Sequence, residues 1–255
     1  MTAIFTQSMM VEATFRFYAE LNDFLPPQMR QRPLAYPFTE PQTVKHLIEA
    51  LRIPHTEVEL ILINSQPVDF TAVVQPHDHV SVYPVFHQLD ISPLPALRPP
   101  LAYPPRFILD NHLGKLARLL RLLGFDTLYP RAHLDDGELA QIAHDEGRVM
   151  LSRDRGLLMR SLISHGYCLR TTNTAEQVTA VLHRYQLHDH IQPWTRCLNC
   201  NGRLHPVPKS EIEHRLQPKT RLYFDDFRLC QDCGQIYWKG SHFAHLQQFV
   251  ERIRP

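Results

Sequence analysis

Hydrophobic and polar residues alternate along the N-terminal part of the chain in the pattern of a small mixed sheet. The run Val11-Glu-Ala-Thr-Phe-Arg-Phe-Tyr18 alternates with a period of two, which predicts a strand. Residues 60–64 and 78–85 predict two more strands. A helix is expected to begin at Thr43, a suitable N-cap, because apolar residues follow at helical spacing, at Val44, Leu47, Ile48 and Leu51. With one intervening strand, this order predicts a β-grasp domain over residues 9–86.

The predicted N-terminal domain resembles the ubiquitin-like sulfur carriers, with Asp78-His-Val-Ser-Val-Tyr-Pro84 as the best local match. Sulfur carriers end in a free Gly-Gly, whereas this chain runs from Val82 to Phe86 without a glycine and continues. Thiocarboxylate chemistry is therefore not expected. We expect instead a docking or solubilising module with a protein partner.

Prolines separate this domain from the rest of the chain. From Pro84 to Pro105 the sequence reads PVFHQLDISPLPALRPPLAYPP, which can form neither a long helix nor a central strand. Residues 87–105 are therefore predicted to form a semi-rigid, extended linker.

Short apolar runs and helical patterns alternate over residues 106–192, which are predicted to form a second domain. The apolar runs predict strands at residues 106–110, 125–129, 148–154 and 167–170. The helical patterns between and after them cover residues 112–123, 135–144, 157–165 and 175–185. Gly124 suits the C-cap of the first helix. The alternation predicts an α/β domain, with a parallel sheet and helices on its faces.

Two cysteine pairs predict a metal site in the last segment, residues 193–255. Cys197 and Cys200 form one CxxC pair, and Cys230 and Cys233 form the other. Four thiolates in two such turns suit a tetrahedral Zn²⁺ ion, and all four positions are then filled by protein, so the zinc is structural. Gly202 and Gly234 follow the two pairs, where we expect permissive backbone.

The alternatives to zinc are two disulfides or a redox CxxC. Disulfides are not expected because the chain shows no secretory signal and has only one other cysteine, Cys168. A redox CxxC normally occurs once and opens a helix. We therefore predict a zinc ribbon, with zinc supplying most of its stability because little else could form its core.

Acidic residues follow two of the predicted strands. Asp110 and Asp154 each come directly after an apolar run, and three acids open the helix after the second strand, Asp135, Asp136 and Glu138. Sites in open parallel sheets form beyond the carboxyl ends of the strands. Converging carboxylates suit Mg²⁺ or Mn²⁺, which can activate water for phosphodiester hydrolysis. The alternative for each acid is helix capping, and Asp135 and Glu138 have the spacing of a capping box.

Basic residues accompany the acids. Lys115, Arg118 and Arg121 recur every third position of the first helix, and Arg153 and Arg155 flank Asp154. We expect these cations to attract the phosphates of RNA, with ordinary solvated charge as the alternative. Tyr237 and Trp238 are expected either to stack on bases or, by preference, to pack on the protein. The net charge is only +1, so any nucleic-acid binding must come from a local basic face.

Three stretches of the chain together resemble a known ribonuclease domain, named after the C-terminal region of the mutator-seven exonuclease homologues. They are FILDNHLGKLARLLRLLGFDTLY, DDGELAQIAHDEGRVMLSRDRGLL and CLNC…CQDCGQIYWKGSH, within residues 106–253. The resemblance implies a PIN-like fold with a zinc ribbon, often preceded by a ubiquitin-like domain. It also implies metal-dependent RNA cleavage, with Asp110, Asp136 and Asp154 as the matching acids and Glu138 as a fourth. Ser152 stands where threonine is common in that family.

The sequence thus predicts a ribonuclease that uses Mg²⁺ or Mn²⁺ and carries a structural zinc ion. One alternative is a non-catalytic RNA- or ribosome-binding adaptor, and another is an interaction scaffold built on the β-grasp domain. No apolar run approaches the about 20 residues of a membrane span, so we expect a soluble, cytoplasmic protein.

Overall fold

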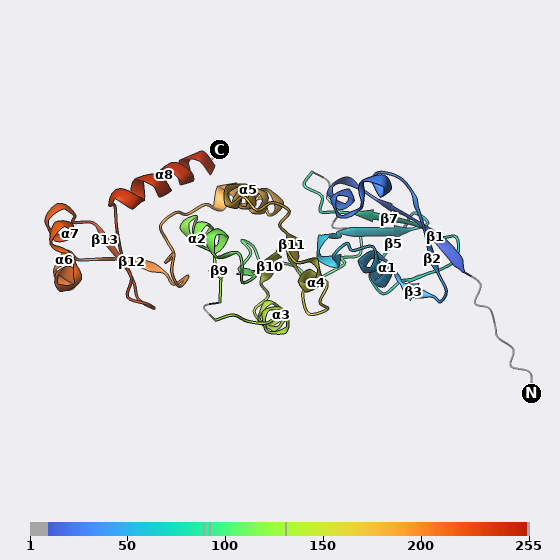
Figure 1. Cartoon of the computed structure of the whole chain (residues 1–255), viewed down its shortest axis with the longest axis horizontal. Helices are drawn as coiled ribbons and strands as arrows, with labels where there is room; N and C mark the ends of the chain where they lie inside the picture. Colours follow the sequence, from blue (N-terminus) through green and yellow to red (C-terminus); the bar gives the residue numbers. More distant parts are fainter. Residues whose placement is uncertain (1–9, 89, 92, 131, 254–255) are drawn as a thin grey trace, which may run out of the picture. The chain divides into compact units, whose positions relative to one another are not determined.

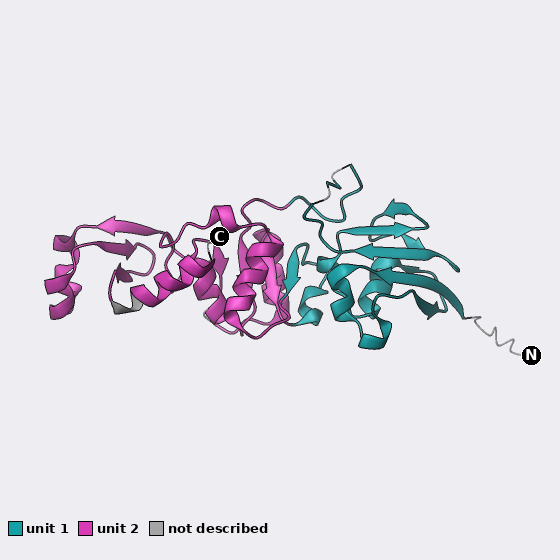
Figure 2. Cartoon of the chain, turned by 90° about the horizontal axis from the view of Figure 1, so that it is seen from above, with its two compact units in different colours: residues 1–100, 154–168 teal, residues 101–153, 169–255 magenta. Residues whose placement is uncertain are grey.

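A computed structural model describes residues 10–88, 90–91, 93–130 and 132–253 of the chain. It divides into two compact units (Figure 2). The first contains the chain up to Pro100 together with Asp154–Cys168, and the second contains Leu101–Arg153 and the chain from Leu169. The predicted outer domain limits, residues 9 and 255, lie outside the described residues, and the predicted domain ranges stay predictions.

The first unit is built on a mixed sheet with the strand order β2-β1-β7-β4-β5 (Figure 1). Its strands are β1 (Val11–Phe17), β2 (Leu34–Phe38), β4 (Leu60–Ile63), β5 (Gln66–Val68) and β7 (His79–Tyr83). The first and last of these, β1 and β7, run parallel side by side, and the other pairs are antiparallel. This arrangement confirms the ubiquitin-like domain. Pro37 is accommodated in β2 because β2 is an edge strand, where a missing N–H is tolerated.

Helix α1 (Val44–Ala50) begins where the sequence predicts it. The Thr43 side chain accepts a hydrogen bond from the backbone N–H of His46, at 3.3 Å, as an N-cap does. Its apolar residues Val44, Leu47 and Ile48 are fully buried. Short elements complete this part of the unit: β3 (Gln42–Thr43) and β6 (Val73–Val74), which pair with each other, and the 3₁₀ turns η1 (Ala19–Phe24), η2 (Pro27–Met29) and η3 (His55–Glu57).

In residues 154–168 the structure differs from one predicted element. The helix expected at 157–165 is only α4 (Arg155–Leu158), and the segment then turns into β11 (Gly166–Cys168). The carbonyl oxygen of Ile163 accepts a hydrogen bond from His55 Nε2 at 2.8 Å, and the backbone N–H of Cys168 donates to Glu57 Oε1 at 2.6 Å. These contacts hold residues 163 and 168 against η3, within the same compact unit.

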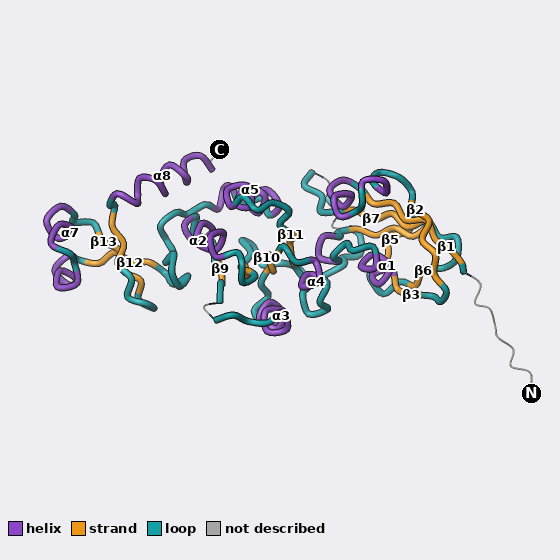
Figure 3. The backbone as a smooth tube through the Cα atoms, in the orientation of Figure 1, coloured by secondary structure: helices purple, strands orange, loops and turns teal. Residues whose placement is uncertain are grey.

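The second unit contains parallel strands in the order β10-β8-β9, with helices packed around them (Figure 3). These are β8 (Phe107–Leu109), β9 (Thr127–Leu128) and β10 (Val149–Ser152), with the helices α2 (Gly114–Leu122), α3 (Asp136–Asp145) and α5 (Thr174–Arg184) and the turn η4 (His188–His190). Every residue of β8 and β10 is buried, as expected when both faces of a parallel sheet are covered. Gly124, at φ +97°, ends α2 as predicted.

The C-terminal part of this unit is an antiparallel sheet of β12 (Leu204–Val207), β13 (Phe227–Cys230) and β14 (Ile236–Trp238). Between β12 and β13 lie α6 (Lys209–Ile212), the turn η5 (Glu213–Arg215) and α7 (Pro218–Tyr223), and α8 (Ser241–Ile253) follows β14. Ile212, Phe227 and Ile236 form a buried apolar cluster of their own. The ribbon therefore has a small core besides its cysteines, contrary to the sequence-based expectation. No described helix is long and apolar enough to cross a membrane.

Candidate functional site

The four cysteines of the ribbon meet at one point. Their sulfur atoms all lie within 4.8 Å of one another, and two pairs are closer, Cys197–Cys233 at 3.6 Å and Cys200–Cys230 at 3.4 Å. A zinc ion with Zn–S bonds of about 2.3 Å sets its ligand sulfurs about 3.8 Å apart. All four thiols are free rather than disulfide-bonded. The cluster can therefore hold a metal such as zinc.

The two cysteine turns have the same backbone geometry. In each, the first cysteine's N–H donates to the carbonyl five residues on, at 2.7 Å for Cys197 and 3.0 Å for Cys230. The N–H four residues on donates back to that cysteine's carbonyl, from Asn201 at 3.0 Å and from Gly234 at 2.8 Å. Asn201 and Gly234 both have positive φ, +77° and +72°. The permissive position of the first turn is thus Asn201, not Gly202.

Gly202 is required for a different reason. A Cβ atom at this position would lie 2.9 Å from the sulfur of Cys230 and against the carboxylate of Asp232. Any larger residue would push the second cysteine turn away from the first.

Tyr237 supports the cluster from beside it. Its hydroxyl lies 3.1 Å from the sulfur of Cys197 and accepts a hydrogen bond from the N–H of Leu198 at 3.0 Å. Burial and the contact with Cys197 raise the pKa of Tyr237. Contacts of this kind orient metal ligands. Tyr237 thus packs on the ribbon, the preferred sequence-based interpretation.

Individual thiols have different acidities. For Cys233, burial raises the pKa, but the N–H of Gln235 and hydrogen bonds from the other thiols outweigh it and bring the pKa to about 7. Because metals bind thiolates, the lowered pKa of Cys233 favours metal binding near neutral pH.

Arg121 is not part of an exposed cationic stripe on α2, contrary to the prediction. It is buried, with 4% of its surface exposed, and its guanidinium donates to the carbonyl oxygens of Thr127, Leu198 and Asn199. Arg121 therefore attaches the first cysteine turn to the parallel sheet and cannot contact a phosphate. Lys115 and Arg118 of the same helix are exposed, as predicted.

Asp126, just before β9, is the centre of a second attachment. Its carboxylate accepts hydrogen bonds from Arg148 at 2.7 Å, Arg196 at 3.1 Å and Asn201 Nδ2 at 2.9 Å. Burial raises the pKa of Asp126, but the hydrogen bonds from Arg148 and Asn201 outweigh it, so the pKa lies below the usual value. The Asn201 side chain also accepts from the N–H of Thr127 at 2.9 Å.

Asp110 lies at the carboxyl end of β8, as predicted. The buried Ser152, the last residue of the neighbouring β10, donates from Oγ to Asp110 Oδ2 at 2.8 Å. The hydroxyl at position 152 thus orients the carboxylate.

Asn111 brings the start of α3 to the same edge of the sheet. Its side chain donates to the carbonyl of Leu134 at 2.7 Å and accepts from the N–H of Leu134 at 3.4 Å. The hydroxyl of Tyr129 donates to the Asn111 carbonyl. Leu134 directly precedes the acids that open α3, so Asn111 and Tyr129 fix where those acids stand.

The acids at the start of α3 have different contacts. Asp135 caps the helix, accepting from the N–H groups of Gly137 and Glu138, and Glu138 Oε2 accepts from the N–H of Asp135 at 2.8 Å. This is a complete capping box. Asp136, in the first turn of α3, is half-buried.

Residue Asp154 and its two flanking arginines lie at the junction of the units in the sequence. Asp154 Oδ1 accepts from the N–H of Gly156 at 2.6 Å and so caps α4 within the first unit. The guanidinium of Arg155 donates to the carbonyl of Phe24 at 3.0 Å and lies 4.9 Å from the centre of that ring. Arg155 therefore has structural contacts, whereas Arg153 is exposed.

The cysteines form the one group of three or more potential metal ligands that meets in the described parts of the chain. Within the second unit, Asp110, Asp136 and Glu138 share an edge of the sheet, yet their carboxylates do not form such a group.

Two family models match the chain, and together they cover most of it. The model of the Mut7-C RNAse domain matches residues 105–250, more than half of the chain. The chain belongs to the Mut7-C RNAse domain family. The model of the Mut7-C ubiquitin domain matches residues 10–90, the region of the β-grasp sheet.

The Mut7-C family assignment agrees with a match to a human protein. The exonuclease mut-7 homolog of Homo sapiens is 32% identical over 101 residues, which are 38% of this chain and 12% of that protein. The chain therefore spans a small part of that relative's length. No solved structure matches the chain. The Mut7-C membership places the chain in a nuclease family.

Sequence reasoning missed the residues that connect the parts of this Mut7-C domain, Asn111, Asp126, Tyr129 and Asn201. Their types are ordinary for loops, and only their contacts across the fold distinguish them. Asn201 alone gave a local signal, since asparagine tolerates the positive φ that a tight cysteine turn needs.

Proposed function

We propose that the chain hydrolyses phosphodiester bonds of RNA, using Mg²⁺ or Mn²⁺ held at the acidic edge of the parallel sheet. One observation carries this proposal within the nuclease family: Asp110 stands at the carboxyl end of β8 with its carboxylate oriented by the buried Ser152, 2.8 Å away. A carboxylate fixed in this way, at the edge where α/β sheets bind their ligands, is suited to a catalytic role.

Carboxylate oxygens are the ligands these cations prefer, and Mg²⁺ commonly takes one or two carboxylates and retains water for its other positions. The proposed ligands are Asp110, Asp136 and Asp154, with Glu138 as a fourth that shares its carboxylate with the capping box. When bound, the cation would supply charge neutralisation at the phosphate and a more acidic water. Among the described residues no three carboxylates meet closely, and such water-rich coordination does not need them to.

Basic side chains would hold the RNA backbone in this proposal. Lys115 and Arg118 project from α2, which begins four residues after Asp110, and Arg153 directly precedes Asp154. Arg155 would act indirectly, because its guanidinium binds the carbonyl and ring of Phe24. The four cysteines would hold a structural zinc ion, with no open position for substrate.

Substitution of Asp110 tests the proposal. Asp110→Asn keeps the size of the side chain and can still accept from Ser152, but removes the charge that would bind a cation. We expect cleavage of single-stranded RNA to fall about 100-fold or more, with thermal unfolding little changed. Asp145→Asn, at the far end of α3, is the matched control and should cleave like the unaltered chain. Equal cleavage by the Asp110 and Asp145 variants would refute the proposal.

A second candidate function is a non-catalytic RNA- or ribosome-binding adaptor. The capping hydrogen bonds of Asp154 and Glu138 favour it, because they give both acids a structural role. The adaptor predicts RNA binding without cleavage by the purified chain at any concentration of Mg²⁺ or Mn²⁺, so the same assay separates the two functions.

A further inference from the structure

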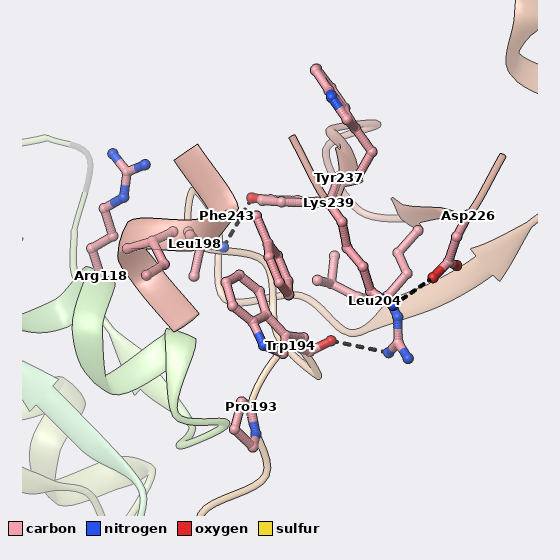
Figure 4. Close-up of a pocket in the computed structure, with 12 residues that line it drawn as sticks. Arg118, Pro193, Trp194, Leu198, Leu204, Asp226, Tyr237, Lys239 and Phe243 are labelled. Atoms are coloured by element: carbon pink, nitrogen blue, oxygen red, sulfur yellow. Dashed lines mark hydrogen bonds and ion pairs between the residues drawn. The ribbon is translucent and has the colours of Figure 1, made fainter. Parts of the chain in front are cut away.

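A pocket of about 350 Å³ lies in the second unit (Figure 4), and Leu198 of the first cysteine turn and Tyr237 are among the residues that line it. Its walls come from α2, from the segment before the first cysteine turn, from the ribbon strands and from α8. Its volume falls within the range of about 300–1,000 Å³ that is usual for small-molecule sites. None of the proposed catalytic acids lines it.

The pocket is rich in aromatic surface. Both tryptophans of the chain, Trp194 and Trp238, line it. Trp194 and Phe243 lie against each other (Figure 4). Their rings stack with centres 4.4 Å apart and an angle of 26° between the planes. Its indole nitrogen donates to Gln247 at 3.3 Å, and its carbonyl accepts from Arg228 at 3.1 Å, so the ring is held in place. Trp238 is 39% exposed.

Positive charge surrounds this aromatic surface. Three cations line the pocket, Arg118, Arg228 and Lys239, against one acid, Asp226. In Figure 4, Arg118 and Asp226 lie on opposite sides. Lys239 pairs with Asp226 at 3.2 Å, but both side chains are about two-thirds exposed, so this ion pair is weak and can open at little cost. The pocket therefore suits a flat ring that carries a negative charge beside it.

We infer that this pocket binds an unpaired base of single-stranded RNA, with the adjoining phosphates on Arg118 and Lys239. Proteins bind single-stranded nucleic acid through aromatic side chains that stack on bases and cations that contact the backbone, and the pocket presents both. The inference rests on the proposed function, because it names the form of RNA that the nuclease takes.

Helix α2 connects the pocket to the acidic edge. The helix begins at Gly114, four residues after Asp110, and Arg118 lies about 6 Å further along its axis. Lys115 is exposed one turn before Arg118. A strand anchored by one base in the pocket would thus meet a second cation before it reaches Asp110. The pocket holds the RNA by a base at a distance from the bond to be cleaved.

Intrinsic fluorescence gives a direct test, since both tryptophans line the pocket. The full chain, loaded with zinc and without added Mg²⁺ or Mn²⁺, is titrated with a single-stranded ten-nucleotide uridine RNA. We expect quenching of tryptophan fluorescence, with an affinity that fluorescence anisotropy of the labelled RNA confirms. Trp238→Ala should weaken binding by about 5- to 150-fold, the range for loss of one base stack. Trp238→Phe keeps a ring and should retain most of the affinity.

Matched controls separate the pocket from general surface effects. Tyr223→Ala removes an aromatic ring on α7 that is 71% exposed and does not line the pocket. The affinity of this variant for the RNA should equal that of the unaltered chain. Arg118→Ala should reduce the slope of log affinity against log salt by about one, whereas Lys219→Ala on α7 should not.

Several results would overturn the inference. These are no binding of the RNA, equal binding by Trp238→Ala and the unaltered chain, or equal binding of an oligonucleotide of the same length that lacks bases. Preference for duplex RNA, or quenching by an apolar peptide but not by RNA, would also overturn it. Because this experiment needs no cleavage, an inactive chain that binds RNA through Trp238 would refute the proposed function and leave the pocket assignment standing.

Discussion

Asp126 shows how a single carboxylate can join two structures that the sequence keeps apart. It receives hydrogen bonds from Arg148, which directly precedes β10, and from Arg196 and Asn201, which flank the first cysteine turn. Removing one partner from such a half-buried network leaves the other polar groups without a hydrogen-bond partner. The free energy lost in this way exceeds the net stability that the intact network contributes.

Asp126→Asn is therefore expected to destabilise the second unit by about 2–4 kcal/mol at pH 7. The pKa of Asp126 is lowered in the folded chain, so its stabilising contribution is present above its unfolded pKa of about 4 and is lost as the pH falls through the folded pKa. The difference in unfolding free energy between the unaltered chain and Asp126→Asn should thus be largest near neutral pH and should shrink below pH of about 4. Urea unfolding across this range measures it, and a difference that does not depend on pH would contradict the account.

The cations of α2 show why residue-level predictions succeed only in part. Lys115, Arg118 and Arg121 follow one another by three positions, so each is displaced by about 60° around the helix axis from the one before. Two steps bring Arg121 about 120° from Lys115, onto the side that faces the cysteine turn, where it is buried. The periodicity is visible in the sequence, but two of the three carbonyl groups that accept hydrogen bonds from Arg121 belong to residues almost 80 positions away.

At the scale of elements, the ribbon has its cysteine cluster at one end and the Ile212–Phe227–Ile236 cluster at the other. Cys200→Ser removes one thiolate ligand and should reduce bound zinc from one ion per chain to a small fraction. The ribbon strands should then lose protection from amide exchange, because metal binding supplies about 10 kcal/mol or more to such units.

Cys168→Ala is the control for this prediction, since Cys168 is buried in β11 and lies outside the cluster. It should keep its zinc, as measured by metal analysis of the purified chain. Full zinc content in Cys200→Ser would mean that the cluster is not the metal site.

Elements with a strong local pattern could be predicted from the sequence, and those set by tertiary contacts could not. Helix α1 has both a threonine cap and apolar residues at helical spacing, and it begins where expected. Helix α4 is shorter than its pattern predicts, and the segment after it contacts His55, about 100 residues before it in the chain. In the site, strand ends predicted the position of Asp110, whereas the link from Asn111 to Leu134 depends on the packed fold.

At the scale of the whole molecule, the ubiquitin-like sheet is more than an addition to a nuclease domain. Residues 154–168, which begin with the proposed catalytic Asp154, belong to the same compact unit as this sheet. His55 is buried and contacts Glu49 at 2.7 Å and the carbonyl of Ile163 at 2.8 Å. Glu57 binds the N–H of Cys168. Contacts from η3, in the ubiquitin-like part of the unit, thus hold the segment that begins with the proposed catalytic acid Asp154.

His55→Ala should loosen this segment, because it leaves Glu49 and the Ile163 carbonyl without their partner, at a cost of about 2–4 kcal/mol. Amide exchange of residues 157–168 should accelerate, and RNA cleavage should fall. His46→Ala, an exposed histidine on α1, is the control. Unchanged exchange in His55→Ala would show that the segment keeps its conformation without the His55 contact.

The central claim, hydrolysis of RNA at a metal-dependent acidic edge, is tested most directly by cleavage kinetics. The rate at which the zinc-loaded full chain cleaves single-stranded RNA is measured against the concentration of added Mg²⁺ or Mn²⁺, beside Asp154→Asn. The account predicts a rate that rises and saturates with either cation and falls by about 100-fold or more in the variant. Cleavage that needs no added cation, or that proceeds equally in Asp154→Asn, would contradict it.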